Sequence, residues 1–265
     1  MDLGLNSKKA YVTGAATGIG REVTRQLAFE GANVFAVDID SDTLQEYIDK
    51  EGLTLVQAYK ADLSTADGCA AASRAGLSHF GGAPDILVNN VGGAKILAFE
   101  DIDDATWQWT LNLNLFSLVR TCRVLLPEMA AAAGGAVVNT LSDFALQPET
   151  TGVDYAATKA AMLNLSKALS RAYGPSVRVN SVCPGPIWTP LWSKPGGIIE
   201  PVEKEYGLKG EEALTALSKA RGMPLARAGR PEEVARAIVF LASSAASFIT
   251  GAVLGVHGGT VRSIF

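Results

Sequence analysis

The chain has 265 residues, and its 23 lysines and arginines against 27 aspartates and glutamates give a formal net charge of −4. Hydrophobic residues make up 48% of the sequence and charged residues 19%, which is typical of a globular protein that buries one large core. The basic residues are scattered, so no cluster provides the positive field that binding to nucleic acid or to an anionic membrane requires.

Cysteine and histidine are both scarce. The three cysteines, Cys69, Cys122 and Cys183, are far apart, and His79 and His257 are the two histidines. This pattern excludes a zinc ribbon and a histidine-rich metal site, so no metal is expected. The uncharged stretch 237–256 contains three serines, a threonine and two glycines, and it fits a helix, turn and strand better than a membrane span. We therefore expect a cytoplasmic protein.

Short apolar runs alternate with helix-length segments of 3.6-residue period. In chain order, strands are predicted at 10–12, 33–37, 54–58, 86–88, 136–139, 177–182 and 253–256, and helices at 18–30, 43–51, 66–79, 107–132, 155–173 and 231–242. This alternation predicts an α/β fold of the Rossmann type: a single domain over 1–265, with a doubly wound, seven-stranded parallel sheet and helices on both faces.

Segment 188–223 interrupts the alternation. It carries several prolines and glycines and one helical piece at 211–220. Long insertions in compact domains are commonly binding loops or lids, so we interpret this segment as a lid over the substrate.

The first predicted strand runs directly into a glycine-rich turn with glycines at 14, 18 and 20, in the spacing G-x-x-x-G-x-G. Such a turn lets backbone N–H groups at a helix N-terminus approach a pyrophosphate. The alternative is a tight strand-to-helix turn that simply needs glycines.

Asp38 ends the second predicted strand, 18 residues after Gly20. A carboxylate there can accept hydrogen bonds from the adenosine ribose hydroxyls and repels a 2′-phosphate, and neither Thr17 nor Ile39 is basic. The position favours NAD over NADP. A solvated loop acid beside Asp40 and Asp42 is the alternative.

Tyr155 and Lys159 are four residues apart on a predicted helix and share one face. An ammonium beside the phenol is expected to lower the tyrosine pKa from about 10 towards the range of a general acid/base. A solvated tyrosine–lysine pair is the alternative, because such a spacing also arises by chance.

Taken together, the ordered motifs resemble those of the short-chain dehydrogenase/reductase family over essentially the whole chain. They are the glycine motif, Asp38, Asp62, Asn89-Asn90-Val91-Gly92, Asn114, Ser142, Tyr155-Ala-Ala-Thr-Lys159 and Pro184-Gly-Pro-Ile-Trp-Thr189. The resemblance implies that Tyr155 is the general acid/base and that Lys159 lowers its pKa and holds the nicotinamide ribose. It further implies that Ser142 hydrogen-bonds the substrate oxygen and that Asn114, rather than its rival Asn112, fixes a water in a proton relay.

The resemblance also implies the residues that hold the cofactor. Asp62 and Leu63 would contact the adenine, and Ile187 and Thr189 would clamp the carboxamide. The full set is Gly14, Thr17, Gly18, Ile19, Gly20, Asp38, Ile39, Asp62, Leu63, Asn90, Val91, Gly92, Tyr155, Lys159, Pro184, Gly185, Ile187 and Thr189.

Three positions depart from the usual family pattern. Val91 replaces an alanine, and His257 stands where an aspartate is common, either as a structural residue of the C-terminal turn or as a catalytic one. Lys95 is either a solvated lysine or a residue at the pocket mouth that favours an anionic substrate.

The expected function is hydride transfer between NAD(H) and a secondary alcohol or ketone. A 3-oxoacyl-thioester reductase and a non-catalytic dinucleotide sensor are the alternatives. Beside Ser142, the residues Phe144, Trp188 and Trp192 either line an apolar substrate pocket or pack the lid down. The surplus apolar surface of helices 107–132 and 155–173 predicts self-association, and the resemblance implies a homotetramer, a dimer of dimers that also uses 253–256.

Overall fold

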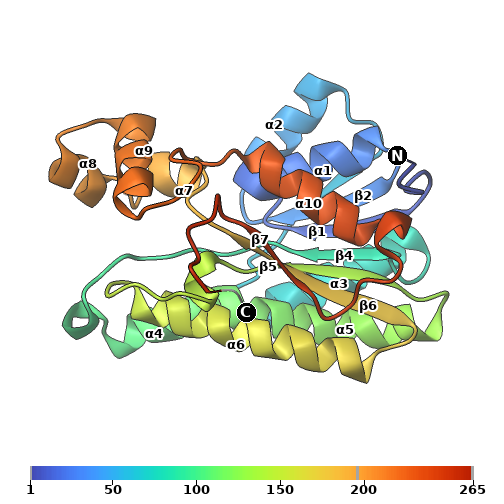
Figure 1. Cartoon of the computed structure of the whole chain (residues 1–265). Coiled ribbons are helices and arrows are strands. Elements are labelled where there is room, and N and C mark those ends of the chain that lie inside the picture. Colours follow the sequence, from blue (N-terminus) through green and yellow to red (C-terminus); the bar gives the residue numbers. More distant parts are fainter. Residues whose placement is uncertain (1, 195–196, 264–265) are drawn as a thin grey trace.

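The computed structural model describes residues 2–194 and 197–263. Its centre is a sheet of seven parallel strands in the order β3-β2-β1-β4-β5-β6-β7, which confirms the predicted doubly wound fold (Figure 1). The strands are β1 Lys9–Thr13, β2 Asn33–Asp38, β3 Val56–Lys60, β4 Ile86–Asn89, β5 Gly135–Thr140, β6 Val177–Pro184 and β7 Val253–Val256.

Helices cover both faces of the sheet, as Figure 1 shows. On one side lie α1 Gly18–Phe29, α2 Ser41–Glu51 and α10 Pro231–Ala242, and on the other α3 Ala66–Phe80, α4 Asp104–Thr110, α5 Ser117–Ala131 and α6 Val153–Ala172. Successive residues of a strand point to opposite faces, so Val12 packs into the first core and Tyr11 into the second. This double burial explains why the inner strands read as continuous apolar runs.

Strand β3 lies two residues later than the predicted 54–58. Gly52 ends α2 in the left-handed conformation (φ 64°), and the Leu53 N–H returns to the carbonyl of Ile48. Leu53 is buried as part of this helix cap, so the next residues complete a turn before the strand starts. The predicted strand 54–58 is therefore correct in its second part, whereas its first two residues belong to the turn that follows the helix cap.

The predicted helix 107–132 is longer at its start and divided by a π-helical turn. Asp103 accepts a hydrogen bond from the Thr106 N–H (2.8 Å) and starts α4, which leads into the π turn η2, Leu111–Phe116, and then into α5. Ser117, the first residue of α5, donates from its hydroxyl back to the carbonyl of Leu113 in the turn (2.7 Å). Such π turns are frequent at functional sites.

Segment 188–223 forms three helices, α7 Pro190–Ser193, α8 Glu200–Tyr206 and α9 Gly210–Ala220, which project from one end of the sheet (Figure 1). The predicted helix at 211–220 is confirmed as α9, whereas α7 and α8 are too short to give a periodic signal. Three residues of the segment, Ile199, Ala213 and Leu214, form a small separate core with Ala228, which follows the segment in the chain.

Among the described residues there are also three short 3-10 turns: η1 Phe99–Asp101, η3 Asp143–Ala145 and η4 Ser244–Ala246. Over residues 2–194 and 197–263, no helix has both the length and the apolar character needed to cross a membrane.

Candidate active site

The strand order reverses between β1 and β4, because β1 neighbours β4 rather than β3, and this is the place where open α/β sheets bind ligands in a crevice. The glycine-rich turn follows β1 and the Asn90–Gly92 segment follows β4, so both reach the same edge. Gly14 has φ +66°, and a Cβ there would lie 2.8 Å from the Cα of Val91. Both the backbone conformation and the close approach therefore require glycine.

The two segments are joined by side chains. The Thr13 hydroxyl accepts hydrogen bonds from the backbone N–H groups of Asn90 (2.9 Å) and Val91 (3.1 Å), and the Asn90 amide donates to the carbonyl of Gly14 (3.1 Å). Thr17, at the N-cap of α1, is exposed and makes no side-chain capping bond. The first turn of α1 thus presents N–H groups without a side-chain cap, next to a fixed loop.

Asp38 is bound to the glycine-rich turn. Its Oδ2 accepts from the Ala16 N–H (2.9 Å) and its Oδ1 from the Asp40 N–H (3.0 Å). The solvated-loop interpretation fits Asp40 instead, which is exposed and caps α2 by accepting from the Thr43 N–H (3.1 Å). Ile39 is 59% exposed beside this carboxylate.

Asp62 and Leu63 lie after β3 on the same side of the crevice. The Asp62 carboxylate is exposed and accepts from the Ser64 N–H (2.9 Å) and hydroxyl (2.6 Å). Leu63 is buried in the second core, so only its backbone can face a ligand.

The Pro184–Thr189 segment forms the opposite wall. Ile187 is buried, the Trp188 N–H donates to the carbonyl of Gly229, and the Gly229 N–H donates to the carbonyl of Pro186 (both 2.9 Å). A Cβ on Gly18 would lie 3.3 Å from the Thr189 side chain, so this wall touches the glycine-rich turn.

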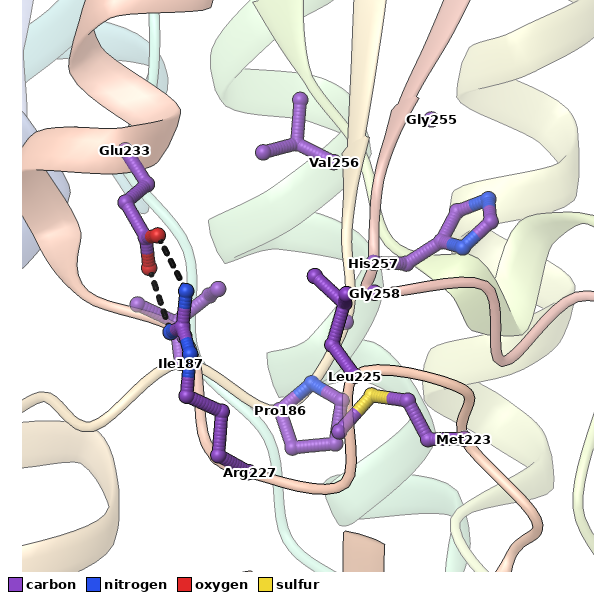
Figure 2. A pocket seen from close by; sticks show the side chains of 12 residues that line it. Pro186, Ile187, Met223, Leu225, Arg227, Glu233, Gly255, Val256, His257 and Gly258 are labelled. Carbon is purple, nitrogen blue, oxygen red and sulfur yellow. Dashed lines mark hydrogen bonds and ion pairs between the residues drawn. The ribbon is translucent and has the colours of Figure 1, made fainter.

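Behind this wall lies a pocket of about 240 Å³, shown in Figure 2. Arg227 and Glu233 pair across it at 2.6 and 2.9 Å, and His257 points away from this pair. The Nδ1 of His257 accepts from the Gly259 N–H (3.2 Å), which supports its interpretation as a structural residue of the C-terminal turn.

Ser142, Tyr155 and Lys159 converge at the end of β5. Lys159 is 3% exposed, donates from Nζ to the carbonyl of Thr140 (3.0 Å) and lies 5.4 Å from the centre of the Tyr155 ring. The Ser142 hydroxyl is within hydrogen-bonding reach of the phenol. Tyr155 lies in the first turn of α6, one turn before Lys159, so a single helix fixes the spacing of the pair.

Burial determines the protonation of the pair. It raises the pKa of Tyr155 above its usual value, an effect that the hydrogen bond from Ser142 partly offsets, and it lowers the pKa of Lys159 to about 8. Burial is the largest cause of the shift in the Tyr155 pKa, because it penalises the phenolate. The expectation that Lys159 lowers this pKa stays a prediction.

Asn114 is fully buried in the π turn. Its amide donates to the carbonyls of Gly93 (2.9 Å) and Thr110 (3.0 Å), and its Oδ1 accepts from the Gly93 N–H (3.2 Å). A Cβ on Gly92 would lie 2.7 Å from the Asn114 Oδ1 and 3.5 Å from the Lys159 Nζ, so these three residues meet. Asn112, the rival, instead accepts from Arg120 (3.0 Å).

Comparison with known proteins decides the family. A family model described as enoyl-(acyl carrier protein) reductase matches residues 14–261. An uncharacterised oxidoreductase of Bacillus subtilis is 35% identical over the full length of both chains. A 3-oxoacyl-[acyl-carrier-protein] reductase of Thermotoga maritima is 33% identical over 97% of this chain and 99% of its own length. L-sorbose reductase of Gluconobacter frateurii, solved with NADPH and L-sorbose, superposes with a TM-score of 0.92 at 34% identity, covering all of both chains. The chain is a short-chain dehydrogenase/reductase.

The aromatic side chains around the site of this oxidoreductase were expected either to line a substrate pocket or to pack segment 188–223 down. Trp188 and Trp192 pack against the small core of segment 188–223, as the packing alternative predicts. Phe144 stands edge-on to Tyr155, with ring centres 5.9 Å apart, and the Arg221 guanidinium lies 5.6 Å from its ring. Lys95 is exposed, 5.3 Å from the centre of the Trp109 ring, which fits a solvated lysine.

Two residues of the site were missed from the sequence, Asp143 and Arg221. Asp143 follows Ser142 directly and is buried, and an acid in this position at the end of a buried strand was the available signal. Arg221 ends α9 and reaches the site only through the fold of segment 188–223, so no local signal marks it.

The two asparagines of the π turn give a matched test. Asn114→Ala removes the three hydrogen bonds that hold Gly93 and Thr110, and we expect turnover to fall about 10- to 100-fold. Asn112→Ala, which loses only the contact with Arg120, is expected to keep turnover within about two-fold of the wild type. Steady-state kinetics of both variants measures this difference. Equal losses of turnover in the two variants would contradict the choice of Asn114 over Asn112 as the site residue.

Proposed function

We propose that this protein transfers hydride between NAD(H) and a secondary alcohol or ketone. The observation that supports this most directly is the convergence of Ser142, Tyr155 and Lys159 beside the glycine-lined crevice. The alternative of a non-catalytic dinucleotide sensor gives no reason to keep a buried lysine next to a tyrosine.

The crevice suits a nicotinamide dinucleotide. Gly14 and Gly18 both have positive φ, and Gly92 leaves space between Asn114 and Lys159 that a side chain would fill. The cradle would hold the diphosphate at α1, the adenosine at Asp38 and Asp62, and the nicotinamide end at Ile187 and Thr189. The bound cofactor supplies or accepts the hydride.

Side chains of this protein transfer the proton and hold the substrate and the cofactor in position. Tyr155 gives a proton to the substrate carbonyl oxygen in reduction and takes it back in oxidation. Ser142 donates a hydrogen bond to the same oxygen, Lys159 holds the nicotinamide ribose, and Asn114 fixes the π turn and the Gly93 backbone. Segment 188–223 acts as the lid.

Tyr155→Phe keeps the ring and its contact with Phe144 but removes the exchangeable proton. Turnover should fall by about 10²- to 10⁴-fold while cofactor binding is retained. Tyr59→Phe, at the far edge of the sheet, is the control and should match the wild type. Cofactor fluorescence and steady-state rates measure the two effects, and near-normal turnover of Tyr155→Phe would refute the role.

We also propose that NAD is preferred over NADP, and the Asp38 carboxylate supports this. Fixed by the glycine-rich turn, the carboxylate cannot swing away from a 2′-phosphate. Lys60, which pairs with Asp38 in the strand register, is the nearest competing charge from β3. L-sorbose reductase was solved with NADPH, so the preference needs a direct test.

Asp38→Ala combined with Ile39→Arg exchanges the repelling charge for an attracting one. The ratio of kcat/KM for NADP(H) to that for NAD(H) should rise by about 100-fold, since each charge change contributes of the order of 1–2 kcal/mol. Asp42→Ala removes an exposed acid nearby and should leave the ratio unchanged. A wild type that already prefers NADP(H) would contradict the role of Asp38.

The substrate class is best resolved by a screen of secondary alcohols and ketones with both cofactors. Similar proteins act on 3-oxoacyl thioesters and on L-sorbose by their names, so the screen includes a 3-oxoacyl thioester and a ketohexose. Exclusive reduction of the thioester would favour that alternative. The cytoplasmic location stays a prediction.

For assembly we propose a homotetramer. On α6, Ala157, Ala160 and Ala161 are exposed, and on β7 Val253 and Leu254 are 42% and 37% exposed. A groove of about 490 Å³ runs between α6, β6 and β7. A second copy would bury this apolar edge, and an isologous contact is the commonest solution.

Light scattering at micromolar concentration tests the assembly. A tetramer of four 27.7 kDa chains is expected, because the exposed edge strand and the two helices offer two separate faces. Leu254→Lys should shift the tetramer towards a dimer, and Leu208→Lys, an exposed leucine on segment 188–223, is the control. A stable wild-type monomer refutes the proposal.

A further inference from the structure

Arg221 is a charged residue beside the site that has no role in the proposed mechanism. It is the C-cap residue of α9, and its side chain is only 21% exposed. Its guanidinium lies 5.6 Å from the centre of the Phe144 ring, and Phe144 stands edge-on to Tyr155 with ring centres 5.9 Å apart. One aromatic ring therefore separates this cation from the proposed general acid/base.

The guanidinium of Arg221 has hydrogen-bonding capacity that the protein does not use. A guanidinium carries five N–H donors in a planar fork, which binds a carboxylate through two parallel hydrogen bonds. Within residues 2–194 and 197–263, the one ionic partner of Arg221 is Glu149, whose carboxylate lies 3.4 Å from Nε. This distance is long for a charge-assisted hydrogen bond, and the two terminal nitrogens donate to no described residue.

Arg262 fixes the backbone of Arg221. The Arg262 guanidinium donates to the carbonyl of Arg221 (3.3 Å), and the Arg262 N–H donates to the Gln147 Oε1 (3.0 Å). The Gln147 amide donates in turn to the carbonyl of Thr260 (3.3 Å). The segment after β7 and the loop after Ser142 are joined by these bonds, so the Arg221 side chain extends from a backbone that is held in place.

The charges around Arg221 suit one added negative charge. Glu149 contacts Arg221 only at Nε, and the buried Asp143 already accepts two hydrogen bonds from its own loop (2.9 and 3.1 Å). Arg262 adds a second positive charge. A phosphate group would bring nearly two negative charges towards both acids, whereas a carboxylate brings one and has two oxygens that match the fork.

We propose that Arg221 binds a carboxylate of the substrate, so that the protein acts on oxo acids and the corresponding hydroxy acids. This inference rests on the proposed function and names the substrate class of the same site. The reacting carbonyl lies at Tyr155, the carboxylate at Arg221, and the apolar carbons between them contact the Phe144 ring. Arg221 touches the substrate but transfers neither proton nor hydride, so it determines specificity.

Glu149 is the internal counter-ion with which the substrate competes. Its side chain is 38% exposed, and a half-exposed ion pair at 3.4 Å contributes little to stability. The substrate carboxylate can therefore take over the guanidinium at little cost. Because Glu149 opposes a second carboxylate next to Arg221, removal of its charge should strengthen the binding of an oxo acid.

Matched acids and esters isolate the contribution of the carboxylate. The probes are 4-oxopentanoate, 5-oxohexanoate and 6-oxoheptanoate, each compared with its methyl ester in the presence of NADH or NADPH. We expect the KM of the wild type to be about 10-fold or more lower for the best acid than for its ester. Equal KM values for acid and ester throughout the series would overturn the proposal.

Arg221→Met removes the charge but keeps an unbranched apolar side chain. For the acid, KM should rise about 10- to 100-fold while kcat changes less than about three-fold, and the ester should keep the wild-type values. Arg221→Lys keeps the charge without the fork and should lie between the two. Lys219→Met, at an exposed lysine in the last turn of α9, is the matched control and should equal the wild type.

Glu149→Gln should have an effect of the opposite sign. It removes the competing charge, so the KM for the acid should fall by about two- to five-fold, and the KM for the ester should not change. If the ion pair only fastened segment 188–223 to the loop after Ser142, Arg221→Met and Glu149→Gln would impair acid and ester alike. That result would show a purely structural role for Arg221 and overturn the proposal.

A binding measurement separates this inference from the proposed function. A wild type that reduces neither acids nor esters contradicts the proposed function. Titration calorimetry with 5-oxohexanoate and its methyl ester, in the presence of NAD, still tests the carboxylate site without turnover. Binding of the acid that is lost in Arg221→Met and kept in Lys219→Met supports the inference, whereas a wild type that binds the acid no better than the ester refutes it.

Discussion

A buried ammonium is the constraint on which the rest of this site depends. Lys159 is 3% exposed, and its Nζ donates to the carbonyl of Thr140 at the end of β5. Burial lowers the pKa of Lys159 from 10.5 to about 8. A folded-state pKa below the unfolded value means that folding favours the neutral amine, so stability decreases as the pH falls from 10.5 towards 8. A shift of this size corresponds to a cost of about 3 kcal/mol at neutral pH.

The position of the Lys159 ammonium is fixed by the parts of the fold around it. The Thr140 carbonyl is fixed by its position at the strand end, and α6 fixes the Cα of Lys159 one turn beyond Tyr155. A Cβ on Gly92 would lie 3.5 Å from the Lys159 Nζ, so the glycine leaves room beside the ammonium. A neutral residue would relieve the cost but would remove the donor from the crevice. A loss in the free energy of unfolding at a functional site, such as this one, is compensated by packing elsewhere in the fold.

The π turn is linked to the same helix. Buried Asp154, directly before Tyr155, accepts from the Thr110 hydroxyl (2.5 Å), and the Thr110 carbonyl accepts from the Asn114 amide (3.0 Å). The other oxygen of Asp154, Oδ1, has no hydrogen-bond partner among the described residues. One chain of contacts therefore runs from α6 through α4 to the backbone of Gly93, and it connects Asn114 to the residue directly before Tyr155.

The sequence predicts those parts of the molecule that local chemistry determines. Apolar runs such as Val34–Val37 must form inner strands because both of their faces are buried, and a glycine is required where φ is positive, as at Gly14. It does not predict the pKa of Tyr155, which depends on how deeply the phenol is buried. Nor does it predict the hydrogen bond between Asp143 and Ser142, since adjacent residues at a strand end can point to opposite sides.

Segment 188–223 contacts the loop after Ser142 through polar side chains, whereas the core contacts within the segment are apolar. Within the segment, Ile199, Ala213 and Leu214 form a small apolar core, which favours movement as one unit. Towards the site, Arg221 lies over Phe144, pairs with the partly exposed Glu149 and accepts at its carbonyl from Arg262 (3.3 Å). Such half-exposed polar contacts contribute little each, so they can break while the apolar core stays intact. Arg221 also opposes the rise in the pKa of Asp143, so the same half-exposed contacts connect segment 188–223 electrostatically to the carboxyl group next to Ser142.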